Sequence, residues 1–350
     1  MAETSPVRAP TAADVARLAG VSKATATRAL GGYGRVNSET RERVRDAART
    51  LGYAANAAAI TMNTGRSGSL GIVARGITNP VWHVAFQGIV DAAREQGLAV
   101  IFAGSEFDLE QERKAVDLMI GKQVDGLIVS AADRNDAEHI ARVVAKGIPL
   151  VLWERRVPSV DAPVVEADVR PASVALARAL IERGHRRIGF VSTLALPTTP
   201  YSLGLELPAS VIQDKVEGLL EPFVELGIEP PLDLIRFPER ERDAVAGAFT
   251  SMLEDDDPPT ALIASDSQIA EVMLEVVRGH ALRVPMDMSL AMYDDLSWAR
   301  LLDPPLTVIA QPNYEMGVHA ARLAMGEQSS ASAFSAELVL RESVGPAPAR

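Results

Sequence analysis

The chain has 350 residues, 47% of them hydrophobic and 23% charged, as in a typical globular protein, and this length suffices for two or three domains. It contains no cysteine, which excludes disulfides, thiolate catalysis and cysteine-ligated metals. No apolar run approaches the ~20 residues needed to cross a bilayer, and the N-terminus lacks the pattern of a secretory signal. We therefore expect a cytoplasmic protein with no membrane partner.

The net charge of −11 is distributed unevenly along the chain. Residues 1–66 carry ten Lys and Arg against five Asp and Glu, a balance of +5, and the remainder carries 25 against 41, a balance of −16. A basic end on an acidic body is expected where that end meets a polyanion such as DNA. A solvated helical face would give the same asymmetry, so charge alone leaves both interpretations open.

After a tail at 1–10 that we expect to be disordered, the sequence predicts three short helices. Each begins after a residue whose side chain can cap the first backbone N–H groups, and each ends at glycine. Asp14 lies three residues after Thr11, the spacing of a capping box. The expected caps are Thr11, Ser22 and either Asn37 or Ser38, and the expected stops are Gly20, the pair Gly31-Gly32, and Gly52. Three short helices with a tight turn at Gly20-Val21 predict a helix-turn-helix.

Residues 56–63 predict one more short helix, and Arg66 to Ser69 form a flexible join to the rest of the chain. A helix of this length is marginal alone in water, so it needs a partner surface to fold.

From Leu70 onward, apolar runs alternate with helical stretches, and the runs are apolar on both faces, as buried parallel strands are. The expected strands of the first series are 70–74, 98–103, 126–130 and 148–153; those of the second are 187–193, 234–237, 261–265, 288–293, 307–310 and 337–341. The pattern predicts an α/β core of two doubly wound lobes facing each other across a cleft. A small molecule would bind beyond the carboxyl ends of the strands.

Several motifs then match one family. They are DVARLAGVSKATATRAL at 14–30, TRERV at 40–44, LGY at 51–53, NTGRSGSLGIV at 63–73, VDGLIVS at 124–130, RGHRRIGFV at 183–191, and YDD at 293–295 ahead of PPLTVIAQP. In this order the chain resembles the lactose/galactose repressor (LacI/GalR) family over nearly its whole length.

The resemblance implies an all-α helix-turn-helix headpiece at 11–55, a hinge helix and linker at 56–68, and a periplasmic-binding-protein-like core at 69–343. Lobe 1 would comprise about 69–167 and 312–327, and lobe 2 about 168–311 and 328–343. The implied function is sequence-specific repression of transcription by a homodimer on pseudo-palindromic operator DNA. A small, carbohydrate-like effector would control operator affinity, and no cofactor is implied.

The family match places the DNA contacts mainly on the second helix, which would lie in the major groove. Lys23, Ala24 and Arg28 sit where the family contacts bases, and Arg28 can donate two hydrogen bonds to guanine. Alternatively, Arg28 clamps a phosphate and carries no sequence information. The remaining exposed candidates are Ser22, Thr25, Thr27 and Asn37, with Ser22, Thr27 and Asn37 as phosphate partners.

In the hinge helix, Met62 aligns with the leucine that the family wedges between central bases, and Ala59 would face the groove one turn earlier. The chain departs from the family pattern at Met62 itself, at Ala55 and at Ile60, which puts the details of the DNA kink in doubt. An alanine-rich linker exposed to solvent is the alternative interpretation.

Effector contacts are carried over only by position in the family pattern. Asp294 is the strongest candidate, although an aspartate that caps a turn would also explain it. Lys215 aligns with an arginine that often grips the effector, and a lysine offers only a point charge. The segment 194–213 is longer than in the family and could reshape the pocket mouth. The other candidates are Asn79, Trp82, His83, Trp153, Glu154, Arg155, Asp266 and Gln311.

Two other functions are compatible with parts of the sequence. An enzyme is disfavoured because the five histidines show no metal-ligand spacing and no phosphate-binding loop occurs. A solute-binding receptor without a DNA role would share the core, but the basic headpiece and the missing signal argue against it.

Overall fold

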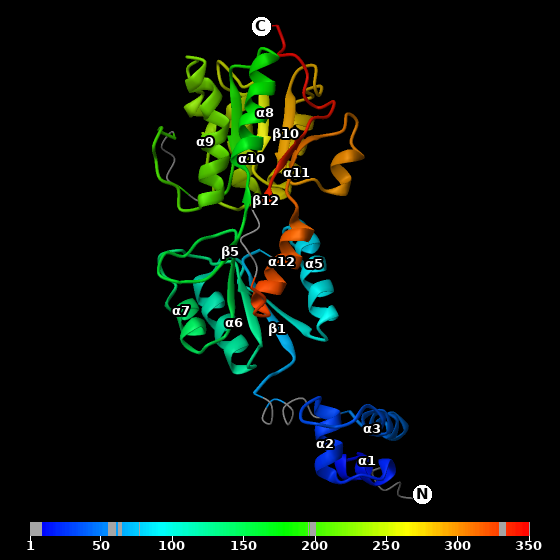
Figure 1. Ribbon diagram of the computed structural model, residues 1–350. Helices are drawn as coiled ribbons and strands as arrows, with labels where there is room; N and C mark the ends of the chain where they lie inside the picture. The colour runs from blue at the N-terminus through cyan, green and yellow to red at the C-terminus, as the bar shows by residue number, and fades with distance from the viewer. Residues whose placement is uncertain are drawn as a thin grey trace, which may run out of the picture.

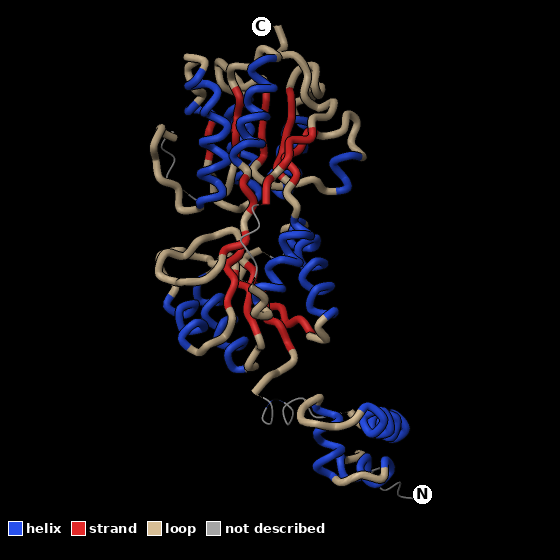
Figure 2. Tube along the Cα trace, in the orientation of Figure 1, coloured by secondary structure: helices blue, strands red, loops and turns tan. Residues whose placement is uncertain are grey.

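The computed structural model describes residues 9–54, 61, 65–76, 78–194, 196, 201–328 and 334–349. Figure 1 shows a small helical headpiece at the N-terminal end and two α/β lobes beyond it, and Figure 2 shows the strands gathered into one sheet in each lobe. Most of the predicted hinge helix, including Ala59 and Met62, lies outside the described residues. Among the described helices, none is both long and apolar enough to span a membrane.

The headpiece contains α1 (Ala12–Ala19), α2 (Lys23–Gly31) and α3 (Ser38–Leu51). Thr11 and Asp14 form the expected capping box, Ser22 caps α2, and Asn37, rather than Ser38, caps α3. Glycines in the left-handed conformation end all three helices, where a side chain would be strained. A small core of valines and alanines holds the helices together: Val15, Ala16, Ala26, Ala29, Val44, Ala47 and Ala48.

The first lobe has a sheet of five strands in the order β2-β1-β3-β4-β5, and all its pairs are parallel. β1, β3 and β4 are buried along their whole length, as the apolar runs predicted. The strands are β1 (Ser69–Ala74), β2 (Ala99–Gly104), β3 (Gly126–Val129), β4 (Leu150–Trp153) and β5 (Val164–Val165), and the helices between them are α5 (Val81–Glu95), α6 (Leu109–Gly121) and α7 (Glu138–Ala145).

The second lobe has a sheet of six strands in the order β13-β11-β10-β9-β7-β8. Its strands are β7 (Ile188–Val191), β8 (Ile235–Arg236), β9 (Ala261–Ala264), β10 (Ser289–Tyr293), β11 (Thr307–Ala310) and β13 (Glu337–Val339). Its helices are α8 (Arg170–Glu182), α9 (Ser210–Glu225), α10 (Arg242–Leu253) and α11 (Ser267–Gly279). Two short 3-10 helices, η1 (Leu232–Leu234) and η2 (Ser297–Arg300), lie in its loops. The last strand, β13, pairs antiparallel with β11, which the sequence pattern did not specify.

Among the described elements the chain passes between the lobes three times. The first passage carries β6 (Ala167–Asp168), and the second leads from β11 to α12 (Asn313–Ala324), which packs on α5 in the first lobe. The third carries β12 (Phe334–Ser335), which pairs in parallel with β6 before the chain enters β13. Two of the passages are therefore hydrogen-bonded to each other at the junction of the lobes.

Helices α5 and α12 cross at backbone contact. A Cβ atom added to Gly317 would lie 2.1 Å from the carbonyl oxygen of Ala85, and one added to Gly88 would lie 2.2 Å from that of Tyr314. Only glycine permits this approach, so α12 is fixed closely against the first lobe immediately after the chain leaves β11.

Candidate functional site

The exposed side of α2 carries the residues expected to meet DNA. Ala26 and Ala29 face the headpiece core, so Ser22, Lys23, Ala24 and Arg28 are left exposed on the other side. Thr25 and Thr27 are half-buried at its margin, and Asn37 is exposed at the start of α3. The exposed side of α2 and the start of α3 therefore present mostly polar side chains outward, as major-groove recognition requires.

Several of these side chains already have partners within the headpiece. The Ser22 hydroxyl accepts from Thr25 N at 3.1 Å, and the Asn37 amide oxygen accepts from Thr40 N at 2.7 Å. The Arg28 Nε donates to the carbonyl oxygen of Ala24 at 3.2 Å, which lays its side chain along its own helix. Ser22 and Asn37 thus fix helix starts, where free N–H groups and the helix dipole also attract phosphate.

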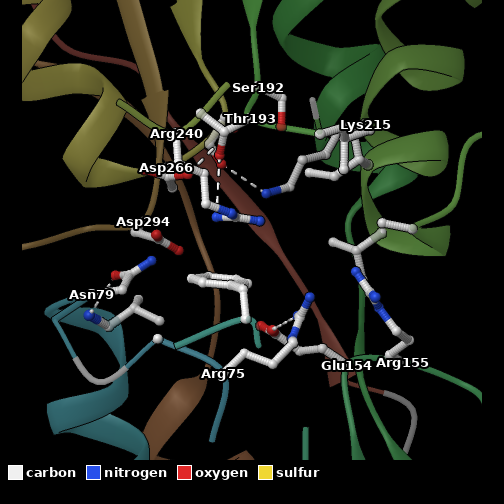
Figure 3. A pocket seen from close by; sticks show the side chains of 18 of the residues that line it. Arg75, Asn79, Glu154, Arg155, Ser192, Thr193, Lys215, Arg240, Asp266 and Asp294 are labelled. Atoms are coloured by element: carbon white, nitrogen blue, oxygen red, sulfur yellow. Dashed lines mark hydrogen bonds and ion pairs between the residues drawn. The ribbon is translucent and has the colours of Figure 1, made fainter. Parts of the chain in front are cut away.

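A cleft of about 850 Å³, part of it open to solvent, lies between the lobes. Its walls include residues that follow β1, β4, β7, β9, β10 and β11. These are carboxyl ends of strands, where open α/β sheets bind ligands. Figure 3 shows the side chains of both lobes pointing into this space.

One part of the cleft combines a buried carboxylate, an amide and a lysine. Asp294 is 3% exposed and accepts a hydrogen bond from Gln311 Nε2 at 3.0 Å. Burial raises the pKa of Asp294 to about 7, and the nearby Lys215 opposes this rise. Asp294 also has a positive φ of 79°, a conformation that is uncommon and strained outside glycine. A strained, buried carboxylate at a strand end is typical of a binding site.

Lys215 is 5% exposed and extends from α9 to the carbonyl oxygen of Ser265, to which its Nζ donates at 2.8 Å. The Nζ also lies 4.2 Å from the ring centroid of Tyr293. Burial lowers the pKa of Lys215, and the charges of Asp294 and Asp266 oppose that fall. Asp266 itself caps α11, accepting from the backbone N–H groups of Gln268 and Ile269 at 2.9 and 3.0 Å.

Another part of the cleft holds three arginines, Arg75, Arg155 and Arg240, and two of them, Arg75 and Arg240, contact Phe107. Arg75 donates from Nε to the Ser130 hydroxyl at 2.9 Å, and Arg240 donates from Nη1 to the Thr193 hydroxyl at 3.3 Å. The guanidinium carbon of Arg240 lies 3.3 Å from the Phe107 ring centroid, and that of Arg75 lies 5.7 Å from it. The aromatic ring thus holds both cations in place through cation–π contact.

Arg155 is 9% exposed and donates from Nη1 to the carbonyl oxygen of Ala132 at 2.8 Å. Burial and then repulsion from Arg75 and Arg240 lower its pKa to about 9, and the charge of Glu154 opposes this fall. Behind it, Ala132 N donates to the buried carboxylate of Glu112, which also contacts His139 Nε2 at 2.7 Å. Arg155 is therefore anchored to a buried polar network, and the three cleft arginines repel one another.

Eight of the ten predicted effector residues line this cleft, and two do not. His83 is exposed on α5, because one residue along a helix turns the side chain about 100° from its neighbour Trp82. Trp153 is the last residue of β4 and is buried in the core, with its ring centroid 5.2 Å from that of Trp82. The lining residues are Asn79, Trp82, Glu154, Arg155, Lys215, Asp266, Asp294 and Gln311.

The sequence interpretation missed several lining residues. Arg75 directly follows β1, so the same rule that selected Asn79 could have selected it. Arg240 and Phe107 lie in loops with no distinguishing pattern. From the long segment at 194–213, Leu194, Ala209, Val211 and Ile212 form an apolar part of the wall.

The lobes also touch directly beside the cleft, where Gln268 Nε2 of α11 donates to the Thr78 hydroxyl ahead of α5 at 3.3 Å. This bond joins the two walls of the cleft, so a change in the angle between the lobes would alter it.

Comparison with known proteins gives consistent matches along the chain. A model of bacterial regulatory proteins of the lacI family matches residues 11–56. A periplasmic binding protein domain matches 70–203, and a periplasmic binding protein-like domain matches 177–344.

Among curated relatives, the probable HTH-type transcriptional regulator EndR of Paenibacillus polymyxa is 28% identical, covering 89% of this chain and 88% of its own. The HTH-type transcriptional repressor CytR of Escherichia coli (strain K12) is 28% identical, covering 97% and 98%. Catabolite control protein A of Priestia megaterium is 29% identical, covering 89% and 90%.

Several solved structures have a similar fold, including two that match nearly the whole chain. The transcriptional regulator CelR in complex with cellobiose has a TM-score of 0.65 and 26% identity, covering 95% of this chain and 99% of that chain. The lac repressor dimer bound to operator and an anti-inducer has a TM-score of 0.78 and 21% identity, covering 97% and 100%.

Proposed function

Since the chain belongs to the lacI family of bacterial regulatory proteins, we propose that it is a sequence-specific transcriptional repressor whose operator affinity is set by a small effector in the interlobe cleft. The observation that carries the proposal is the combination, in one chain, of an outward-facing α2 and a polar cleft between two lobes. A solute receptor does not need an outward-facing recognition helix, and a simple DNA-binding domain does not need a polar cleft between two lobes.

The headpiece supports recognition of duplex DNA through α2. Lys23, Ala24 and Arg28 would read base edges, while Ser22, Thr27 and Asn37 would meet phosphates. One headpiece offers a small surface, so two copies of the chain would bind a pseudo-palindromic operator. Ala59 and Met62 would complete the contact in the minor groove.

The cleft supports control by a ligand, because its walls come from both lobes. A ligand that contacts Asp294 in the second lobe and Asn79 in the first favours a particular angle between the lobes. If operator binding requires one of the two lobe arrangements, the ligand changes the free energy of operator binding. The change can be no larger than the difference in the ligand's own binding free energy between the two arrangements, and such coupling is typically about 1–3 kcal/mol. The carboxylate and amides suit a ligand with many hydroxyl groups, so we infer a carbohydrate-like effector.

The curated relatives are named as regulators, and we infer that this chain likewise regulates and catalyses no reaction. The lobes then serve as a sensor in which ligand binding, rather than chemical conversion, is the output.

The test begins with selection of DNA fragments by the full-length protein, followed by fluorescence anisotropy on a selected duplex and on a scrambled one. Arg28→Ala is expected to weaken binding to the selected duplex by about 1–3 kcal/mol and to affect the scrambled duplex much less. Equal loss on both duplexes would assign Arg28 to phosphate contact instead.

Arg178→Ala is the matched control, because Arg178 lies on α8 in the second lobe, where it pairs with Glu225. It removes the same charge and is expected to leave DNA binding unchanged. Failure of the full-length protein to enrich any sequence would contradict the proposed function.

A further inference from the structure

The charges that line the cleft do not balance locally. The lining residues include four cations and three carboxylates. Glu154 lies 3.8 Å from Arg75, and Asp266 and Asp294 act on Lys215. Among the described residues, no carboxylate lies within 4.0 Å of Arg155 or Arg240, so these two guanidinium groups have only neutral hydrogen-bond acceptors.

Keeping Arg155 in the cleft is costly because it is buried, whereas Arg240 is exposed. A buried cation without a counter-charge loses its hydration and gains no ion pair in return. Arg155 is 9% exposed, and its pKa falls to about 9 because burial and then repulsion from Arg75 and Arg240 outweigh the attraction of Glu154 and Asp133. The pKa of Arg240 is also lowered, first by burial and then by Arg75. An anion placed among the three arginines would supply the missing counter-charge and offset their mutual repulsion.

The site is built to hold these cations in position. Arg75 is fixed by the Ser130 hydroxyl, Arg155 by the Ala132 carbonyl oxygen, and Arg240 by stacking on Phe107. Guanidinium groups held in a fixed orientation are suited to bidentate hydrogen bonds with the oxygens of a carboxylate or a phosphate. Figure 3 shows Arg75, Arg155 and Arg240 extending into the same space from different elements.

Arg75 and Arg155 belong to the first lobe, and Arg240 follows β8 in the second. Without an anion, their repulsion acts across the cleft and opposes its closure. With an anion between them, all three are attracted to the same point, and the attraction acts between the lobes. The anionic group would therefore contribute to the lobe movement as well as to affinity.

We propose that the effector is an acidic polyol, with hydroxyl groups at Asp294 and Gln311 and a carboxylate or phosphate among Arg75, Arg155 and Arg240. This inference rests on the proposed function and specifies the effector class. The hydroxyl-binding part and the cationic part lie in the same cleft, so a single sugar acid or sugar phosphate can reach both.

The first test uses inorganic phosphate, the smallest probe of the cationic part, with the full-length protein. Millimolar phosphate is expected to raise the thermal midpoint above that in chloride at equal ionic strength. The double variant Arg155→Gln/Arg240→Gln is expected to lose this rise. The matched double variant Arg142→Gln/Arg178→Gln removes two charges from surface ion pairs and is expected to keep it.

The second test compares acids with their neutral parents by calorimetry: galacturonate with galactose for the carboxylate, and glucose 6-phosphate with glucose for the phosphate. At least one acid is expected to bind at least tenfold more tightly than its parent. That preference is expected to fall at least tenfold in the Arg155→Gln/Arg240→Gln variant. Whichever acid is preferred identifies the source of the anion.

Three outcomes would overturn the inference: no stabilisation by phosphate, equal stabilisation of the wild type and the Arg155→Gln/Arg240→Gln variant, or neutral sugars that bind as tightly as their acids. Sequence selection on DNA is unaffected by all three. If the anion tests fail while DNA selection succeeds, the effector class is wrong and the proposed function stands. If DNA selection fails, the proposed function is wrong whatever the anions do.

Discussion

Replacing Gly317 with alanine tests the close crossing of α5 and α12. The added Cβ would lie 2.1 Å from the carbonyl oxygen of Ala85, whereas ordinary contact begins at 3.4 Å, so one backbone must retreat by the difference, 1.3 Å. The obstacle is backbone and cannot rotate away. A retreat of this size forfeits a quarter or more of the dispersion attraction at the atoms that separate.

The expected cost follows from two opposing effects. Overpacking of this kind costs ~1–3 kcal/mol, and the upper end applies because backbone blocks the methyl group. In the opposite direction, alanine in a helix interior stabilises the helix by about 1 kcal/mol relative to glycine. We therefore expect Gly317→Ala to lower the free energy of unfolding by ~2 kcal/mol.

Gly247 provides the matched control, because it lies in α10, is exposed, and would have nothing within 4 Å of an added Cβ. Gly247→Ala should raise the free energy of unfolding by ~0.5–1 kcal/mol. Urea titrations at 25 °C and one protein concentration would measure both variants. The reasoning is refuted if Gly317→Ala is as stable as Gly247→Ala.

Two further predictions concern the headpiece and the cleft. Thr11→Ala removes the side-chain cap of α1 and should destabilise the headpiece by ~1 kcal/mol, seen as faster hydrogen exchange in α1; unchanged exchange would contradict the role of the cap. The pKa of Asp294 is raised from 3.8 to about 7, so the folded state keeps this proton to a higher pH than the unfolded state does. The contribution of protonated Asp294 to the free energy of unfolding is therefore complete below pH 3.8 and is lost as the pH rises through 7. Asp294→Asn should therefore gain stability relative to the wild type between pH 4 and 7, with a ceiling of ~4 kcal/mol, in urea titrations at several pH values; a pH-independent difference would rule this out.

The sequence predicted those parts of the fold that local patterns determine. The Thr11–Asp14 spacing predicted a capping box, and the apolar runs predicted buried strands such as β1 and β3. The antiparallel direction of β13 was not predictable, because the alternation of side chains does not record which way a partner strand runs.

The site was predictable only as far as position along the strands allowed. Glu154 and Arg155 follow β4 directly and enter the cleft, while Trp153, still within the strand, packs beneath it. Arg240 and Phe107 meet through the closing of the two lobes, 133 positions apart in sequence, and no local pattern records such a contact.

Since the chain passes between the two sheets three times, no single break in the backbone can part the lobes. Helix α12 completes the first lobe and β13 completes the second, although both come from the last forty residues. During synthesis, the ribosome must therefore release almost the entire chain before either lobe can acquire its full set of elements. Neither lobe corresponds to a continuous fragment, and a gene cut at any point between α8 and β11 would leave both lobes incomplete in both fragments.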